Sequence, residues 1–180
     1  MTFLVVGIDC PVARALHDSE PVARLGAAAG AILEQRPDQI AIVALAAPIG
    51  PVGAAAPAAL AELAGRTITL AVVVAKLAAQ LEQPVRIAIL SPADGVIPDH
   101  HDGARSVVAA GLTMLTEVAS ALPLITINTI AVADDVPPQE VAALTRFVLS
   151  GATPSLNGAT IRLDGGRDAV LAFETRAEGD

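Results

Sequence analysis

Short runs rich in β-branched residues alternate with longer runs rich in alanine and leucine along this chain. Such alternation is typical of βαβ units built around a parallel sheet. Several of the short runs are continuously apolar, so we expect helices to cover both faces of the sheet. The runs that predict strands are residues 3–8, 39–45, 85–90, 124–131 and 160–163. The pattern predicts the α/β class.

The longer runs predict the helices that connect these strands. They are residues 11–17, 21–34, 56–82 (with a break near Gly65), 102–122 and 138–150. Asp102 can cap the fourth of these helices, and the Pro137-Pro138-Gln139-Glu140 segment opens the fifth with proline and a first-turn carboxylate. A chain of 180 residues suits one domain with a substantial core, so we predict a single domain over residues 1–180.

The helix predicted at residues 102–122 has more apolar surface than one core contact needs. Its apolar side chains form two adjacent stripes, which together cover about 200° of the circumference, twice the ~100° of a surface helix. The first stripe consists of Val108, Leu112, Leu115, Ala119 and Leu122, and the second of Val107, Ala110, Met114, Val118 and Ala121. We predict that the second stripe, with Val72 on the preceding apolar helix, packs against a partner subunit.

Charge and composition exclude several kinds of function. The net charge is −8, the pI is near 4.7 and three Phe are the only aromatic residues, so nucleic-acid binding is not expected. The N-terminal run lacks the basic region of a secretory signal, and the apolar run at residues 68–81 is shorter than the ~20 residues of a membrane span. We therefore expect a cytoplasmic protein. Cys10 is the only cysteine, which excludes an intramolecular disulfide.

Several segments match the pattern of one enzyme family. Phe147-Val148-Leu149-Ser150 ends a predicted helix, and the sequence GATIRLDGG follows at residues 158–166. Earlier segments are ITINTIA at 125–131, AGL at 110–112 and PDQIAIV at 37–43. Together they resemble the short-chain dehydrogenases/reductases, in which an F-L-x-S-like phrase precedes a G-x-x-x-x-V-D-G-G strand. The resemblance implies a Rossmann-like fold, here lacking the second and third strands of the family.

The resemblance also implies where the family's catalytic groups would lie. The family uses an Asn-Ser-Tyr-Lys set, in which tyrosine exchanges the substrate proton and lysine lowers the pKa of that tyrosine. This sequence contains no Tyr, and the alignment places Arg105 at the tyrosine position, Ala109 at the lysine position and Thr69 near the asparagine. Arginine stays protonated at neutral pH and is a poor general acid. Ser91 falls near the serine position and is interpreted as vestigial, so no catalytic residue is expected.

The cofactor motif is depleted in the same way. Gly7 remains from the family's G-x-x-x-G-x-G motif, whereas Pro11 and Ala13 replace its later glycines. Proline removes an amide donor, and Asp9 adds a negative charge where a phosphate would lie. We therefore expect this chain to bind no cofactor itself, and NAD(P) to be held by a partner subunit.

The segments that the chain retains are those that form dimer and tetramer interfaces in the family. They are the sheet, the two long helices and the final strand, on which Ile161 and Leu163 lie. The expected function is a non-catalytic (pseudoenzyme) subunit that joins an active short-chain dehydrogenase/reductase in a hetero-oligomer, with self-association as a further possibility. The complex is expected to be an oxidoreductase acting on a hydroxy or keto substrate, with acyl thioesters among the candidates.

Two other functions stay open from the sequence. One is an enzyme with rewired residues that uses Arg105 or His100, and the other is a module that binds a hydrophobic small molecule in the emptied cleft. The cluster Asp99-His100-His101-Asp102 contains metal-ligating side chains, but adjacent loop residues point apart and no spaced third ligand is evident. We expect a solvated loop and no metal there.

Overall fold

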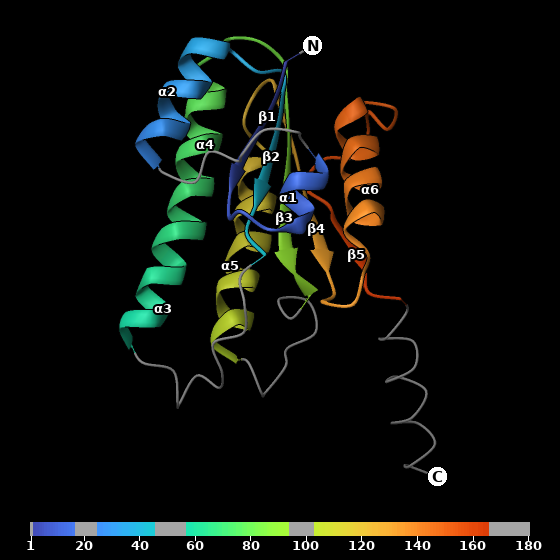
Figure 1. Ribbon diagram of the computed structural model, residues 1–180. Helices are drawn as coiled ribbons and strands as arrows, with labels where there is room; N and C mark the ends of the chain where they lie inside the picture. Colours follow the sequence, from blue (N-terminus) through green and yellow to red (C-terminus); the bar gives the residue numbers. More distant parts are fainter. Residues whose placement is uncertain (1, 17–24, 46–56, 94–102, 166–180) are drawn as a thin grey trace.

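Five parallel strands form one sheet in the computed structural model, which describes residues 2–16, 25–45, 57–93 and 103–165 (Figure 1). The strands are β1 (Phe3–Gly7), β2 (Gln39–Val43), β3 (Val85–Pro92), β4 (Ile125–Val132) and β5 (Thr160–Leu163). Their order across the sheet follows their order along the chain. All five predicted strands are confirmed, and their ends differ from the prediction by at most two residues.

Helices occupy the runs between the strands. They are α1 (Pro11–Leu16), α2 (Leu25–Gln35), α3 (Pro57–Ala64), α4 (Leu70–Ala79), α5 (Gly103–Ala119) and α6 (Pro138–Ser150). The predicted break near Gly65 is a π-helical turn, η1 (Gly65–Thr69), between α3 and α4. The predicted helix starts at residues 21 and 102 lie outside the described residues, as does the predicted Asp102 cap.

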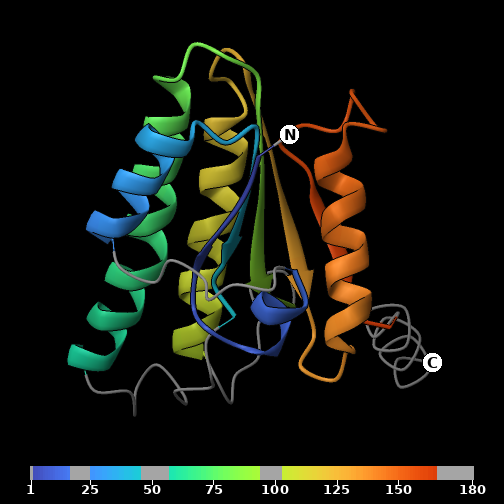
Figure 2. The same cartoon turned by 45° about the horizontal axis from the view of Figure 1, so that its top comes forward.

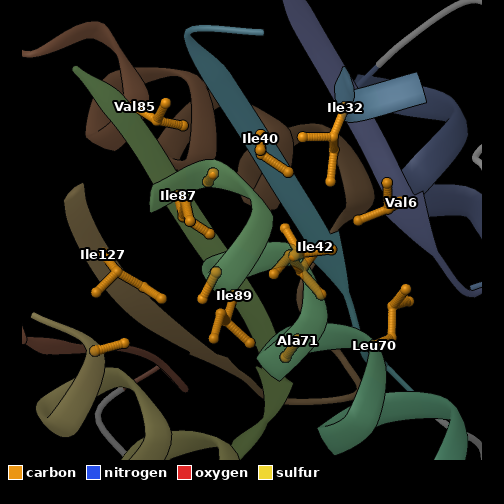
Figure 3. Close-up of a cluster of buried hydrophobic side chains, with 14 of the residues drawn as sticks. Val6, Ile32, Ile40, Ile42, Leu70, Ala71, Val85, Ile87, Ile89 and Ile127 are labelled. Atoms are coloured by element: carbon orange, nitrogen blue, oxygen red, sulfur yellow. The ribbon is translucent and has the colours of Figure 1, made fainter. Parts of the chain in front are cut away.

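Helices cover both faces of the sheet, as its continuously apolar strands predict (Figures 1 and 2). On one face, Ile87 and Ile89 of β3 pack in a buried cluster with residues of α2, α4 and α5 (Figure 3). On the other face, Ala88 and Leu90 belong to a second cluster built with α1 and α6. Because side chains alternate between the faces of a strand, one apolar run supplies both cores.

The strand order explains how the sheet relates to dinucleotide-binding folds. Such folds arrange their strands roughly as 3-2-1-4-5-6, with the first strand inside the sheet. Here β1 is an edge strand that pairs with β2, and among the described residues no strand pairs with its outer side. The arrangement confirms the predicted Rossmann-like sheet without the family's second and third strands.

Candidate functional site

The carboxyl ends of the strands surround a cavity of about 230 Å³. Ligands of open α/β folds bind at this edge of the sheet, so the cavity is the first candidate site. Its lining residues come from the β1–α1 turn, the ends of β2, β3 and β4, and the first turns of α1, α5 and α6. They are Cys10, Pro11, Val12, Leu45, Pro92, Arg105, Val132, Ala133, Asp134, Val136 and Pro138.

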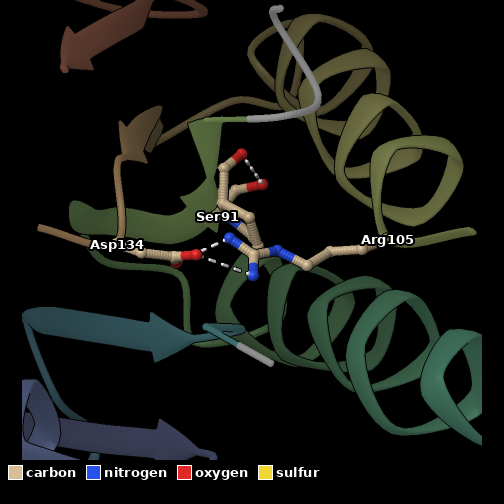
Figure 4. A network of polar contacts seen from close by, with 4 residues as sticks. Ser91, Arg105 and Asp134 are labelled. Carbon is tan, nitrogen blue, oxygen red and sulfur yellow. Dashed lines mark hydrogen bonds and ion pairs between the residues drawn. The ribbon is translucent and has the colours of Figure 1, made fainter. Parts of the chain in front are cut away.

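A buried ion pair lies at the wall of this cavity (Figure 4). Arg105, near the start of α5, is only 3% exposed, and its guanidinium donates to both carboxylate oxygens of Asp134, at 2.7 and 3.2 Å. Asp134 follows β4, and its side chain is 71% exposed. The two-pronged contact is the strong form of an arginine–carboxylate interaction. It joins the start of α5 to the end of β4.

The structure brings Ser91 to the same end of the sheet as Arg105 (Figure 4). Ser91 is buried at the end of β3, and its hydroxyl donates to the carbonyl of Pro92 at 3.4 Å, near the limit for a hydrogen bond. Ala109 is buried one turn after Arg105 and offers no functional group. Thr69 is exposed in η1 and is not part of the cavity lining.

Gly7 has a structural role that the sequence comparison did not reveal. Its φ is +120°, and a Cβ atom added to it would lie 2.2 Å from the carbonyl oxygen of Val43 on β2. Real Cβ atoms essentially never approach another atom so closely. The contact between β1 and β2 therefore requires glycine at this position whether or not a phosphate ever binds nearby.

Asp9, in the turn between β1 and α1, forms an ion pair that also lay outside the sequence prediction. The Arg14 guanidinium donates to both of its carboxylate oxygens, at 2.9 and 2.7 Å. The negative charge that was expected to repel a phosphate is thus accompanied by a positive one. The electrostatic argument against phosphate binding is weaker than the sequence indicated.

This ion pair predicts a local pH dependence. The hydrogen bonds from Arg14 hold the pKa of Asp9 below its ordinary value. The pair therefore stabilises the fold above the ordinary carboxyl pKa, and this contribution is lost as the pH falls through the lowered pKa. We expect Arg14→Gln to raise the pKa of Asp9 toward its ordinary value in a carboxyl NMR titration. An unchanged titration midpoint would contradict the pair.

Two features of the described residues at this edge differ from a dinucleotide site. The cavity of about 230 Å³ is below the ~300–1,000 Å³ of pockets for drug-sized ligands, and a dinucleotide is larger than those ligands. Pro11 begins α1 without an amide hydrogen, and α1 is only six residues long.

A second hollow lies between α4 and α5, and two residues of the predicted interface line it. It has a volume of about 410 Å³ and a largely apolar lining, to which Val72 and Val118 contribute. In the predicted second stripe of α5, Val107, Met114 and Val118 are 57%, 57% and 70% exposed, and Val72 on α4 is 42% exposed. Ala121 is also exposed and Ala110 is half-buried, whereas the first stripe faces the core. We call the face formed by Val72, Met114, Val118 and their neighbours the α4–α5 face.

The remaining predicted residues are less exposed. Ile161 and Leu163 of β5 are half-buried and pack against the core on the α6 side, so part of their apolar surface is covered within the chain. The Asp99–Asp102 cluster lies outside the described residues. Within the described ranges, no three His, Cys, Asp or Glu side chains form a group that could hold a metal ion, and no helix is long and apolar enough to cross a membrane.

Asp134 is the site residue that sequence reasoning missed. It was seen only as part of the connection after β4, and its neighbour Asp135 offers an identical side chain. The partner, Arg105, is 29 positions earlier in the chain. Residues so far apart in the chain cannot be identified as partners from local sequence, because their contact exists only after β4 has paired with β3.

No family model matches the sequence, and no curated protein matches it. Solved structures do match. An oxidoreductase of the short-chain dehydrogenase/reductase family from Burkholderia thailandensis has a TM-score of 0.83 and 18% identity, covering 98% of this chain and 97% of that one. A variant of a Serratia marcescens short-chain dehydrogenase/reductase has a TM-score of 0.79 and 15% identity, covering 92% and 96%.

A third structure, described as a glucose/ribitol dehydrogenase of the same family from Brucella melitensis, has a TM-score of 0.77 and 13% identity, covering 92% of this chain and 95% of that one. At such identities the likeness establishes the fold alone. The chain has a fold like that of the short-chain dehydrogenases/reductases.

Proposed function

We propose that this chain is a non-catalytic subunit that associates with an active short-chain dehydrogenase/reductase and stabilises or shapes an oxidoreductase complex. The active subunit would hold NAD(P) and act on a hydroxy or keto substrate, with acyl thioesters among the candidates. The observation that carries the partner role is the exposed, apolar α4–α5 face on a chain whose fold is shared with these oxidoreductases.

The residues at the strand ends support a non-catalytic role. The chain contains no Tyr, and Arg105 is buried in an ion pair with Asp134. A guanidinium that is permanently protonated and paired neither gives nor takes a proton at neutral pH. Ser91 has a backbone carbonyl beside it and no base among its hydrogen-bond partners, so it offers no activated nucleophile.

The α4–α5 face supports association. Contiguous exposed apolar side chains on a small domain usually mark an interaction surface. Here Val72 and Val118 line the α4–α5 hollow, in which Lys76 and Gln80 are the only polar lining residues of the described chain. An apolar centre with few charged groups is the composition of an interface core. A related subunit with the same fold would offer a similar pair of helices.

Co-expression tests this proposal directly. The full chain would be co-expressed with a short-chain dehydrogenase/reductase encoded close to it, and the products separated by size exclusion with light scattering. We expect a mixed oligomer of fixed stoichiometry, in which NAD(H) binds only to the other subunit. If this chain is monomeric both when expressed alone and when co-expressed, the proposal is overturned. NAD(P)H binding by this chain alone would favour the enzyme with rewired residues.

Val118 provides the sharpest single substitution. Its side chain is 70% exposed, so Val118→Lys is expected to leave the fold intact within ~0.5 kcal/mol. The charge would be buried on association, and we expect the oligomer to dissociate. Phe147→Lys is the matched control, because Phe147 is 50% exposed on α6, on the opposite side of the sheet. Equal behaviour of both variants by light scattering would argue against the α4–α5 face.

A further inference from the structure

The cavity of about 230 Å³ at the strand ends is lined by one buried cation, Arg105, and by apolar side chains. This combination indicates a class of ligand. We propose that the cavity binds a short-chain aliphatic carboxylate, whose carboxylate replaces that of Asp134 on Arg105 and whose chain lies along the apolar walls. This inference goes beyond the role of a partner subunit and does not depend on it.

Arg105 determines the charge and shape of the head group. It is the only cationic side chain among the described residues that line the cavity, and its guanidinium is held in place by burial at the start of α5. A planar guanidinium matches a carboxylate through two parallel hydrogen bonds, as its contact with Asp134 already shows. A cationic or neutral head group would not replace the negative charge of the Asp134 carboxylate.

Asp134 makes the exchange possible. Its side chain is 71% exposed, whereas that of Arg105 is 3% exposed. Asp134 can therefore turn into water with little change in its own solvation. Arg105 would keep a carboxylate partner throughout, so the buried charge is never left uncompensated. The Asp134 carboxylate competes with the ligand for Arg105. The apparent affinity for the ligand is therefore reduced in proportion to the fraction of molecules in which Arg105 is free of Asp134.

The other walls determine the rest of the ligand. Val12, Pro92, Val132 and Val136 present aliphatic side chains around the cavity. A volume of about 230 Å³ equals roughly eight water-sized groups of ~30 Å³ each. A six-carbon monocarboxylate has about that many non-hydrogen atoms. Acetate would leave the apolar walls uncovered, and part of a long fatty acid would extend beyond them.

Calorimetric titration of hexanoate into the full chain tests the head group and the tail separately. We expect hexanoate to bind, and we expect both hexan-1-ol, which lacks the charge, and acetate, which lacks the chain, to bind at least about tenfold more weakly. Binding of hexan-1-ol as tight as that of hexanoate would overturn the proposed role of Arg105. Binding of acetate as tight as that of hexanoate would overturn the role of the apolar walls.

Two substitutions distinguish the proposed exchange from nonspecific binding. Asp134→Asn removes the competing carboxylate and is expected to tighten hexanoate binding about tenfold. Arg105→Met is expected to abolish hexanoate binding. If the Met variant does not fold, Arg105→Lys replaces it. Lysine keeps the charge but lacks the two parallel donors, so hexanoate is expected to bind this variant more weakly. Glu34→Gln, a charge change at an exposed position of α2, is the control and should change nothing.

The direction of the Asp134→Asn effect is the decisive result. If Asp134 were part of a different kind of site, its loss would weaken binding or leave it unchanged, and either result would overturn the exchange. The assay reads ligand binding by this chain and does not depend on oligomerisation. A failure of the subunit proposal therefore leaves a monomer that can still be titrated, and the two outcomes remain separate.

Discussion

Gly7→Ala is expected to lower the free energy of unfolding by about 3–5 kcal/mol, through steric overlap and an unfavourable positive φ. The added Cβ would lie 2.2 Å from the carbonyl oxygen of Val43, and this oxygen belongs to the β2 backbone, which cannot move without breaking the sheet. Because typical domains have only about 5–15 kcal/mol of stability, we expect a variant that is close to unfolding.

Gly30→Ala is the matched control for this experiment. Gly30 lies in α2, and a Cβ atom there would meet no heavy atom within 4 Å. Alanine in a helix interior is expected to stabilise the chain by about 0.5–1 kcal/mol. The chain has no Trp or Tyr, so urea unfolding is best followed by far-ultraviolet circular dichroism. Two small effects of similar size would mean that the β1–β2 contact does not require glycine.

This comparison also separates two explanations of a familiar motif residue. The sequence motif identifies Gly7 as a remnant of a phosphate-binding turn. Its distance to Val43 supplies a reason to keep glycine without any ligand. A large loss of stability in the cofactor-free Gly7→Ala protein would show that the strand contact alone is enough to retain it.

Asp134→Ala is expected to lower the free energy of unfolding by about 2 kcal/mol, below the ~3–5 kcal/mol for breaking a fully buried pair. The expected loss of stability is smaller than for a fully buried pair because the Asp134 side chain is 71% accessible to solvent. The cost arises mainly at Arg105, whose side chain is 3% accessible and whose charge would lose the Asp134 carboxylate.

The double variant Arg105→Met/Asp134→Ala provides the test of this reasoning. An uncharged side chain of similar length needs no partner, so the double variant is expected to be more stable than Asp134→Ala alone. Glu34→Gln, at an exposed position on α2, controls for the change in net charge and should alter stability by less than ~0.5 kcal/mol. Additive losses in the cycle would show that the two side chains do not interact.

The two ion pairs at the strand ends are of different kinds. Asp9 and Arg14 are close in sequence and both largely exposed, so their removal should change titration more than stability. Arg105 and Asp134 connect separate elements across the end of the sheet, and one partner is buried. Only the second pair can both fasten α5 to β4 and present a buried cation to a ligand.

Local pattern was enough to predict the strands and most of the helices. β5 and α6 begin and end where the sequence predicted, because an apolar run flanked by Gly, Pro or polar residues specifies its own secondary structure. The two stripes of α5 were also readable, since helical periodicity alone decides which side chains share a face. The missing strands followed from chain length and from the resemblance.

The tertiary structure decided what those elements bring together. The Arg105–Asp134 contact and the approach of Gly7 to Val43 are not readable from local pattern. The physical reason is that hydrophobic periodicity indicates only which side chains of one helix or strand share a face. Which distant residues meet is determined by strand order and register, and these place the ends of β1 to β4 around one cavity.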